Sequence, residues 1–292
     1  MHIAQSTTDK LGTLYIIATP IGNRQDITLR AIDVLKGVDR IAAEDTRHAM
    51  HLLEHFAIKK PMISFHQFNE EKRLEVILNY LKAGESIALV SDAGTPLVSD
   101  PGFQLVQVAH TCGIRVIPIP GACALIAALS AAGLPTDRFI FEGFLSSKRE
   151  AREKRLRQLS HEPRTLIFYE APHRLLVTLQ SFSTVFGGER QLVIARELTK
   201  LYEQITMKSI AGWIKYYDDP TERVRGEIVL LLRGIDDSVE TEVDDKRAVT
   251  SKEALAILLK ELPLKQAVSL ACEITGERRN VLYDWALKFK SE

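Results

Sequence analysis

A loop that carries two carboxylates and two glycines follows an apolar, strand-like run of the chain. The run is Ile87–Val90, and the following residues 91–102 read SDAGTPLVSDPG, with Asp92 and Asp100 as the carboxylates. In an open α/β sheet, ligands bind at loops that leave the carboxyl ends of strands, and glycine lets the backbone come close to a ligand. We therefore expect the chemistry of this protein at this loop.

Other polar loops also leave the ends of predicted strands. They contain Glu44-Asp45-Thr46-Arg47, Pro120-Gly121, Tyr169-Glu170 and Arg196-Glu197. Each could be purely structural, because an aspartate such as Asp45 caps helix N-termini and an acid pairs with a nearby base. Five such loops together favour a binding site. The candidates for a catalytic base stay open among Asp45, Asp92, Asp100, Glu170, His173, Glu197 and Lys200.

Several common activities lack their motif in this chain. The first predicted strand is followed by one glycine, Gly22, and not by G-x-G-x-x-G, which counts against a nicotinamide-dependent enzyme. A Walker A sequence is missing, so phosphoryl transfer has no support. His48, His51 and His55 lie on one side of a predicted helix, but the H-E-x-x-H order and a further ligand are missing. We therefore expect no metal.

Composition limits the cellular compartments and the binding partners that we expect for this protein. Lysine plus arginine and aspartate plus glutamate number 38 each, so any affinity for nucleic acid must come from locally clustered charge. The three cysteines are far apart and form no CxxC pair, which is typical of a reducing compartment. No run approaches the roughly 18 apolar residues of a membrane span. We expect a cytoplasmic protein that is not bound to a membrane.

Basic charge is clustered in residues 146–164, which read SSKREAREKRLRQLSHEPR. The segment has helical character and contains Lys148, Arg149, Arg152 and Arg155. Two interpretations stay open. It could be a solvated helix face with ion pairs at i, i+4 spacing, or it could contact phosphates and position an RNA backbone.

Short apolar runs alternate with segments of helical period in the first half of the chain. The predicted strands are Leu14–Ala18, Arg40–Ala43, Ile87–Val90, Arg115–Ile119 and Phe139–Phe141. The predicted helices are Thr28–Leu35, Arg47–Phe56, Glu70–Lys82, Phe103–Cys112 and Ala122–Ala132. Strict alternation predicts a mostly parallel sheet with helices on both faces.

A second α/β block, a linker and a helical tail complete the predicted organisation. The block contains the strands Thr165–Tyr169, Gln191–Ala195, Tyr202–Met207 and Glu227–Arg233, and the last three suggest a hairpin and a mixed sheet. Residues 235–249 include six acidic residues and read as a linker, after which a capping box at Thr250 opens three short helices. The predicted parts are an N-terminal tail (1–12), two α/β domains (13–145 and 146–234) with a cleft between them, the linker, and a helical extension (250–292).

Taken in order, eight motifs of the chain resemble one family. They are ATPIGN, EDTR, SDAGTPLVSDPG, PGACALIAALSAAGLP, GFL, TLIFYEAPHR, ARELTK and RGEIVL. The family is ribosomal RNA small subunit methyltransferase I, a branch of the tetrapyrrole-methylase (class III) S-adenosylmethionine methyltransferases. The segment ELPLKQAVSLACEITGERRNVLYDWAL resembles the helical extension of the same family.

The resemblance implies a fold, an activity and partners. It implies two α/β domains with S-adenosyl-L-methionine in the cleft between them, a homodimer, and 2'-O-methylation of a cytidine in the decoding centre of 16S ribosomal RNA in the small subunit, expected to be cytidine 1402 in conventional rRNA numbering. Methylation of a tetrapyrrole or of a protein on the same scaffold is the alternative. An RNA-binding assembly factor with a vestigial cleft is a third, non-enzymatic possibility.

The resemblance also implies site residues. Its cofactor contacts map to Pro20, Ser91, Asp92, Ala93, Gly94, Thr95, Pro96, Pro120, Gly121, Ala122, Phe168, Tyr169, Glu170, Ala195, Arg196, Glu197, Gly226 and Glu227. The tetrapyrrole branch usually carries Gly-Asp-Pro in the first loop, and this chain departs from it. Our hypothesis places the catalytic residues Asp45, Arg47, Asp92, Glu197 and Lys200 around the ribose. The expected RNA contacts are Lys148, Arg149, Arg152, Arg155 and Arg174.

Overall fold

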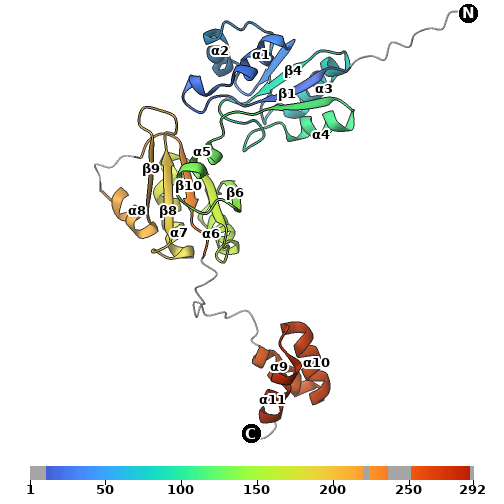
Figure 1. The fold of residues 1–292 in the computed structure, drawn as a ribbon, viewed down its shortest axis with the longest axis vertical. Coiled ribbons are helices and arrows are strands. Elements are labelled where there is room, and N and C mark those ends of the chain that lie inside the picture. Colours follow the sequence, from blue (N-terminus) through green and yellow to red (C-terminus); the bar gives the residue numbers. More distant parts are fainter. Residues whose placement is uncertain (1–10, 220–223, 236–250, 290–292) are drawn as a thin grey trace, which may run out of the picture. The chain divides into compact units, whose positions relative to one another are not determined.

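The computed structural model describes residues 11–219, 224–235 and 251–289, with side chains up to residue 287 (Figure 1). The chain divides into two compact units, Met1–Asp236 and Asp237–Glu292. The first unit contains two five-stranded sheets, and the described part of the second is helical.

The first sheet is parallel throughout. Its order is β3-β2-β4-β1-β5, and each neighbouring pair is parallel. Its strands are β1 (Thr13–Ile17), β2 (Arg40–Ala43), β3 (Met62–Ser64), β4 (Ile87–Val90) and β5 (Arg115–Ile119). The connecting helices are η1 (Arg24–Asp26), α1 (Leu29–Gly37), α2 (Thr46–His55), α3 (Glu70–Lys82) and α4 (Phe103–Thr111). The parallel sheet predicted for this half is confirmed.

Helices cover both faces of this sheet because its strands are apolar on both sides. All four residues of β4 are buried. Ala88 and Val90 belong to a cluster with residues of α1 and α2, whereas Ile87 and Leu89 belong to a cluster with residues of α3 and α4. Side chains alternate along a strand, so a strand buried on both faces reads as a continuous apolar run.

The second sheet is mixed, with the order β6-β7-β10-β8-β9. β6 and β7 are parallel, whereas β10 is antiparallel to both of its neighbours, and β8 and β9 form an antiparallel pair. The strands are β6 (Phe139–Phe144), β7 (Thr165–Glu170), β8 (Gln191–Arg196), β9 (Gln204–Ser209) and β10 (Ile228–Leu232). The predicted hairpin and mixed sheet are confirmed.

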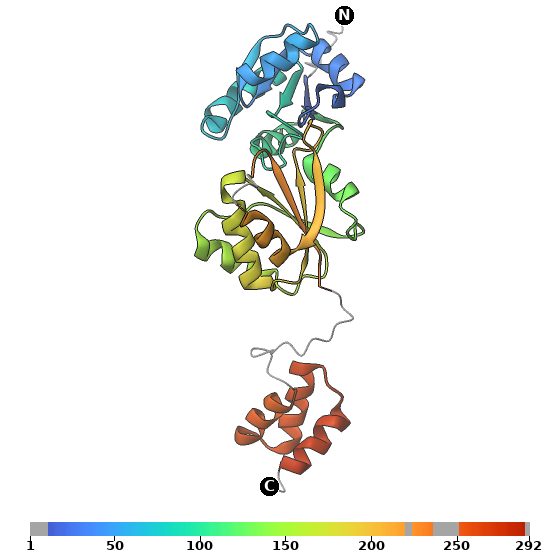
Figure 2. The same ribbon diagram turned by 90° about the vertical axis from the view of Figure 1, so that its left-hand side faces the viewer.

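Helices also cover both faces of the second sheet. Figures 1 and 2 show α5 (Ala124–Ala131, green) on the opposite face from α6 and α7. The helices of that other face are α6 (Arg149–Gln158), η2 (Pro172–Arg174), α7 (Leu175–Phe186) and α8 (Ile210–Tyr217). They enclose an apolar cluster that includes Phe168, Phe182 and the buried Trp213.

One predicted strand belongs to a different sheet than expected. Phe139–Phe141 was predicted with the strands of the first block, but β6 pairs with β7 at the edge of the second sheet. The chain changes sheets at the Pro120-Gly121 turn, because α5 already packs against β7 and β10. Periodicity identifies a strand but not its partner. β3, at three residues, is too short to show a strand period and went unpredicted.

The described part of the second unit is a three-helix bundle of α9 (Ser251–Glu261), α10 (Leu264–Thr275) and α11 (Arg279–Phe289). Small and apolar residues such as Ala267, Ala271 and Leu282 form its buried core. Gly276, with φ of +71°, adopts the left-handed conformation that ends α10. The predicted capping box begins at Thr250, and the acidic linker from residue 236 onward, like residues 1–10, lies outside the described residues.

Candidate functional site

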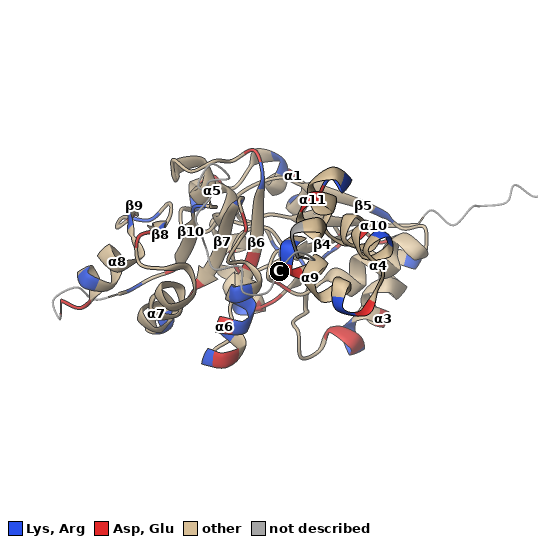
Figure 3. Ribbon diagram, turned by 90° about the horizontal axis from the view of Figure 1, so that it is seen from below, with Lys and Arg blue, Asp and Glu red and all other residues tan. Residues whose placement is uncertain are grey.

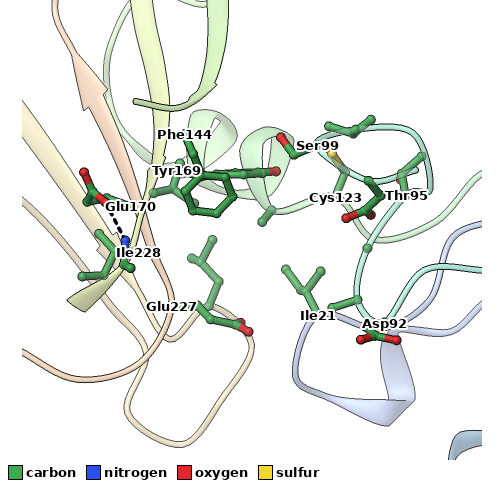
Figure 4. A pocket seen from close by; sticks show the side chains of 18 of the residues that line it. Ile21, Asp92, Thr95, Ser99, Cys123, Phe144, Tyr169, Glu170, Glu227 and Ile228 are labelled. Carbon is green, nitrogen blue, oxygen red and sulfur yellow. Dashed lines mark hydrogen bonds between the residues drawn. The ribbon is translucent and has the colours of Figure 1, made fainter. Parts of the chain in front are cut away.

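A cavity of about 440 Å³ lies where loops of the first sheet face the second sheet (Figure 4). Figure 4 shows Asp92, Thr95 and Ser99 on one side of it and Tyr169 and Glu227 on the other. Its lining consists of Ile21, Glu44, Asp92, Ala93, Gly94, Thr95, Val98, Ser99, Asp100, Cys123, Ala124, Phe144, Tyr169, Glu170, Ala171, Pro172, Leu198, Gly226, Glu227, Ile228 and Val229. Its volume is that of a small-molecule site.

The loop of residues 91–102 is held in a strained shape beside the cavity. Thr19 and Gly94 exchange backbone hydrogen bonds of 2.8 and 3.0 Å. Gly94 has φ of +81°, and two residues with side chains, Leu97 and Ser99, also have positive φ values, +73° and +69°. Such backbone conformations cost of order 1–3 kcal/mol each and cluster at functional sites. The loop is therefore shaped by tertiary contacts and not by local preference alone.

The Pro-Gly turn supports this loop from behind. A Cβ added at Gly121 would lie 2.9 Å from the Ala18 Cβ, so only glycine allows this close approach to the end of β1. The Thr95 hydroxyl donates a hydrogen bond to the Ala122 carbonyl at 3.1 Å. Pro120, Gly121 and Ala122 themselves do not line the cavity. Their predicted place at the site is thus a supporting one.

Strand alternation decides which residues of β7 and β8 reach the cavity. Tyr169 lines it, and its hydroxyl accepts a hydrogen bond of 3.2 Å from the Leu125 amide at the start of α5. Phe168 points to the opposite face, into the cluster beneath α7, and Ala195 is fully buried against α5. Arg196 donates to the Gln204 side chain. Phe168, Ala195 and Arg196, which were predicted as cofactor contacts, therefore do not line the cavity.

Glu197, Lys200 and Glu227 form an ion-pair cluster at the rim of the cavity. The Lys200 Nζ lies 2.9 Å from the Glu197 Oε1 and 3.0 Å from the Glu227 Oε2. Glu197 also accepts from the Glu227 amide at 3.0 Å. Burial acts to raise the pKa of Glu197, but these bonds outweigh it and hold that pKa below its ordinary value. Burial acts to lower the pKa of Lys200, but the bonds to the two carboxylates outweigh it and raise that pKa. Both groups are therefore charged at neutral pH.

Asp45 and Arg47 bind each other at the end of β2. Asp45 caps α2 by accepting the Arg47 amide at 2.8 Å, and its Oδ2 lies 2.8 Å from the Arg47 Nη2. The hydrogen bonds from Arg47 lower the pKa of Asp45. The Asp92 Oδ1 accepts the Asp45 amide at 3.0 Å, which joins the two loops. The helix-cap interpretation of Asp45 is confirmed, and the Arg47 side chain stays 84% exposed.

The charges that line the cavity have one sign. The ionisable carboxylates are Glu44, Asp92, Asp100, Glu170 and Glu227, and no lysine, arginine or histidine lies among the described residues of the lining. Burial, with the neighbouring carboxylates adding to it, raises the pKa of Glu44 and of Asp100. Burial also raises the pKa of Tyr169 to about 12. This arrangement favours a cationic ligand and disfavours phosphate.

The predicted cofactor residues therefore divide into two groups. Those that line the cavity are Asp92, Ala93, Gly94, Thr95, Tyr169, Glu170, Gly226 and Glu227. Those that do not line it are Pro20, Ser91, Pro96, Pro120, Gly121, Ala122, Phe168, Ala195, Arg196 and Glu197. Both Glu170 oxygens are occupied, by the Ala171 amide and by the Thr178 hydroxyl. Glu44 was not predicted at the site. Its position directly after β2, beside Asp45, is the sequence feature that could have indicated a place at the site.

The basic helix α6 is largely neutralised. Figure 3 shows acidic and basic residues side by side along it. Arg149 and Arg157 pair with Glu153 at i, i+4 spacing, and Arg155 pairs with Glu142 at 2.7 Å. The solvated-face interpretation therefore describes most of this helix. Lys148 is exposed and remains a candidate for RNA.

Two arginines predicted to bind RNA serve the fold. Arg152 is 3% exposed and donates to the Ser181 hydroxyl at 3.0 Å and to the carbonyls of Ser146 and Ser147. Arg174 donates to the Leu145 carbonyl and lies 3.4 Å from Glu170. The Arg152 guanidinium, predicted to contact RNA, is thus buried and bonded within the protein.

Two further properties hold within the described part of the chain. No group of three or more histidine, cysteine, aspartate or glutamate side chains is placed to hold a metal ion there. No helix among the same residues has the length and apolar character needed to cross a membrane.

Comparison with known proteins identifies the family. Residues 13–211 match the family described as Tetrapyrrole (Corrin/Porphyrin) Methylases, and residues 247–290 match the RsmI C-terminal HTH domain. The Ribosomal RNA small subunit methyltransferase I of Pseudomonas aeruginosa is 52% identical over 277 residues, which cover 95% of this chain and 97% of the relative. The chain belongs to the ribosomal RNA small subunit methyltransferase I family. The Escherichia coli O157:H7 member is 48% identical over 284 residues, covering 97% of this chain and 98% of that protein.

Solved structures show the same fold at low sequence identity. The cobalt precorrin-4 methyltransferase CbiF is 16% identical with a TM-score of 0.56, over 76% of this chain and 94% of its own. A uroporphyrin-III C-methyl transferase from Thermus thermophilus, solved with S-adenyl homocysteine, is 17% identical with a TM-score of 0.53, over 75% of this chain and 97% of its own. The family thus has the tetrapyrrole-methylase fold, as the sequence motifs imply.

Proposed function

We propose that this protein uses S-adenosyl-L-methionine to methylate the 2'-hydroxyl of a cytidine ribose in the RNA of the small ribosomal subunit. The observation that carries the cofactor assignment is the sign of the charges around the cavity, whose described lining includes five carboxylates and no cation. Arg174 and Lys200, which pair with Glu170 and Glu227, lie outside this lining. Membership of the small subunit methyltransferase I family supports the RNA substrate.

The cavity fits S-adenosylmethionine on chemical grounds. The cofactor carries a sulfonium and an ammonium group, both of which are stabilised by carboxylates such as Asp92 and Asp100. Ile21, Leu198 and Val229 give the same cavity apolar walls suited to the adenine ring. A dinucleotide or a nucleoside triphosphate would bring several phosphates next to these acidic groups. The lining therefore selects against those cofactors.

The chain's own residues have to align and deprotonate the ribose hydroxyl. When bound, S-adenosylmethionine supplies an electrophilic methyl group whose thioether leaves neutral, so that no general acid is needed. The 2'-oxygen gains the methyl group and gives up its proton to a base, and a placed base contributes about 10²–10⁴-fold. Alignment and exclusion of water supply much of the remaining acceleration.

Two carboxylates are the best candidates for this base. Asp45 and Glu197 have lowered pKa values and Lys200 a raised one, so none of the three accepts a proton readily at neutral pH. We propose that the base is Glu44 or Asp100, whose raised pKa values bring them closer to neutrality. The positive groups at the rim then take other roles.

Arg47 and Lys200 are proposed to hold the RNA backbone. The Arg47 side chain is 84% exposed at the end of β2, and the Lys200 Nζ is bound to Glu197 and to Glu227, which lines the cavity. Cations outside an acidic cavity would bind phosphates while the cofactor stays inside. Such contacts position the nucleotide without reading its base.

We further propose that the protein acts as a homodimer in the cytoplasm. Leu201 and Tyr202, 88% and 71% exposed in the loop after β8, offer apolar surface of the kind that interfaces use. Sedimentation of the wild-type protein and of a Leu201→Asp variant checks this. A monomeric wild-type protein would refute the dimer without affecting the catalytic proposal.

The activity itself is tested by transfer of label. The protein is incubated with labelled S-adenosylmethionine and small subunits that lack the methyl group, and the digested RNA is searched for 2'-O-methylcytidine. We expect stoichiometric label on cytidine ribose and none on a porphyrin precursor. Label on the precursor alone would replace this proposal with the tetrapyrrole alternative. Saturable heat on titration with S-adenosylmethionine separates either enzyme from a vestigial binding protein.

A further inference from the structure

A second cavity, of about 340 Å³, lies at the carboxyl end of β3. We propose that it binds an unpaired nucleobase next to the nucleotide that is methylated, an inference that rests on the proposed RNA substrate. Its walls are the turn of residues 67–69, the first residues of α3, and Gln104 near the start of α4.

The position of this cavity places it beside the catalytic one. β3 is two strands away from β4 in the order β3-β2-β4, and all three strands are parallel. With strands about 4.8 Å apart, the ends of β3 and β4 are separated by roughly 10 Å. That spacing suits a nucleotide close in sequence to one held at the end of β4. Arg47, at the end of the intervening β2, is placed to meet the phosphates between the two.

Phe68 gives this cavity a stacking surface. Its side chain is 87% exposed, the second highest exposure among the large hydrophobic residues described. Phe103, the residue before Gln104, is 68% exposed. Proteins bind unpaired bases by stacking them on aromatic side chains, because every base has a π-face. An aromatic ring kept in water at the edge of a catalytic site is thus explained by a base that covers it.

The turn that carries Phe68 is fixed before any ligand arrives. Asn69 accepts the His66 amide at 2.9 Å through its Oδ1, and its Nδ2 donates to the Ser64 carbonyl at 3.2 Å. These bonds tie the turn to the end of β3. Preorganisation of this kind reduces the entropy lost when a ligand is bound.

The polar lining suits the edge of a base and not a phosphate. The charged residues of the lining are Glu70, Glu71 and Lys72, so its net charge disfavours a phosphate. Gln67 and Gln104 can donate and accept as a base edge requires. The Glu70 Oε1 is buried and accepts no hydrogen bond from the described residues. Buried acceptors normally have a donor, and carboxylates accept from the exocyclic amino groups of bases. We therefore expect cytosine, adenine or guanine here and not uracil.

The test measures methylation of unmethylated small subunits by Phe68→Ala, Phe68→Trp and the wild-type protein. Because Phe68 is 87% exposed, its replacement should leave the fold intact. We expect Phe68→Ala to raise KM for the subunit about tenfold with kcat and the affinity for S-adenosylmethionine unchanged, and Phe68→Trp to retain the wild-type KM. Phe139→Ala, at the start of β6 and therefore at the far end of that strand from the site, is the control and should match the wild type.

A second measurement reports the contact directly. Ultraviolet crosslinking of the wild-type complex should join the peptide containing Phe68 to a nucleotide within a few positions of the methylated one. An unchanged KM in Phe68→Ala, or a crosslink elsewhere on the RNA, overturns the inference while the proposed function stands. Failure of the wild-type protein to methylate the subunit overturns the proposed function and this inference with it.

Discussion

Gly226 is a position at which one added methyl group should disturb both the fold and the cavity. Its φ is +82°, and a Cβ there would lie 2.1 Å from the Glu197 Oε1. Gly187 provides a matched control, because its φ is +81° and nothing lies within 4 Å of an added Cβ. Alanine at Gly187, where ψ is 166°, therefore adds backbone strain alone, of order 1–3 kcal/mol. Alanine at Gly226 adds strain at a similar positive φ and also displaces the Glu197 carboxylate.

The additional cost follows from the bonds of Glu197. Its Oε1 accepts from the Lys200 Nζ at 2.9 Å and from the Glu227 amide at 3.0 Å, and both bonds are lost when the side chain moves away. Hydrogen bonds to charged groups contribute about 1.5–3 kcal/mol each, of which water replaces part at this half-open rim. We expect Gly226→Ala to lower the free energy of unfolding by about 3–5 kcal/mol, against about 1–3 kcal/mol for Gly187→Ala.

Urea unfolding followed by circular dichroism measures both values, and calorimetry measures the affinity for S-adenosylmethionine. Gly226 lines the cavity, so its alanine variant should also bind the cofactor at least tenfold more weakly, whereas Gly187→Ala should bind as the wild type does. Equal unfolding free energies and equal cofactor affinities for the two variants would refute the view that Gly226 exists to make room for Glu197.

Three further substitutions test other parts of the site. Asp100→Asn should raise the free energy of unfolding at pH 7 but weaken S-adenosylmethionine binding several-fold. Burial raises the pKa of Asp100, so the wild-type protein loses stability as the pH rises above the ordinary carboxyl pKa of 3.8. Urea unfolding at pH 4.5 and 7 measures the stability, and calorimetry at the same two pH values measures the binding. Arg152→Ala should lower the free energy of unfolding by about 2–4 kcal/mol because buried acceptors lose their donor, whereas Arg149→Ala should change little in the same urea assay. Tyr169→Phe leaves the Leu125 amide without its acceptor, which should cost about 1–3 kcal/mol of stability by thermal unfolding and weaken cofactor binding.

Local sequence pattern predicted the elements well and their partners less well. Alternation of apolar runs and helical segments identified β1, β2, β4 and β5 and their parallel arrangement, because a buried parallel strand has an unmistakable apolar run. The same signal could not assign Phe139–Phe141 to the second sheet, since strand pairing is decided by long-range packing. The loop of residues 91–102 was located from glycines and carboxylates at a strand end, which is a local feature.

Side-chain direction separates the predicted site residues that line the cavity from those that do not. Phe168 and Tyr169 are neighbours in the same motif, but strand alternation buries the first under α7 and turns the second toward the cavity. Arg152 lies in a basic run that reads as a nucleic-acid contact, yet Ser181 and nearby carbonyls bind it inside the fold. A motif indicates which segment is functional. The phase of the strand or helix decides which of its residues are.

The two cavities and the arginine between them suit the cofactor and the RNA of the proposed reaction. Five carboxylates and no cation belong to the described lining of the larger cavity, where a sulfonium would be stabilised and a phosphate repelled. The exposed Arg47 lies outside it at the end of β2, between that cavity and the one beside Phe68. A cofactor inside, a phosphate at Arg47 and a base on Phe68 follow the same edge of the first sheet in order. Because each group is excluded from the others' sites by charge or shape, this edge can orient an RNA strand before the ribose hydroxyl reaches the methyl group.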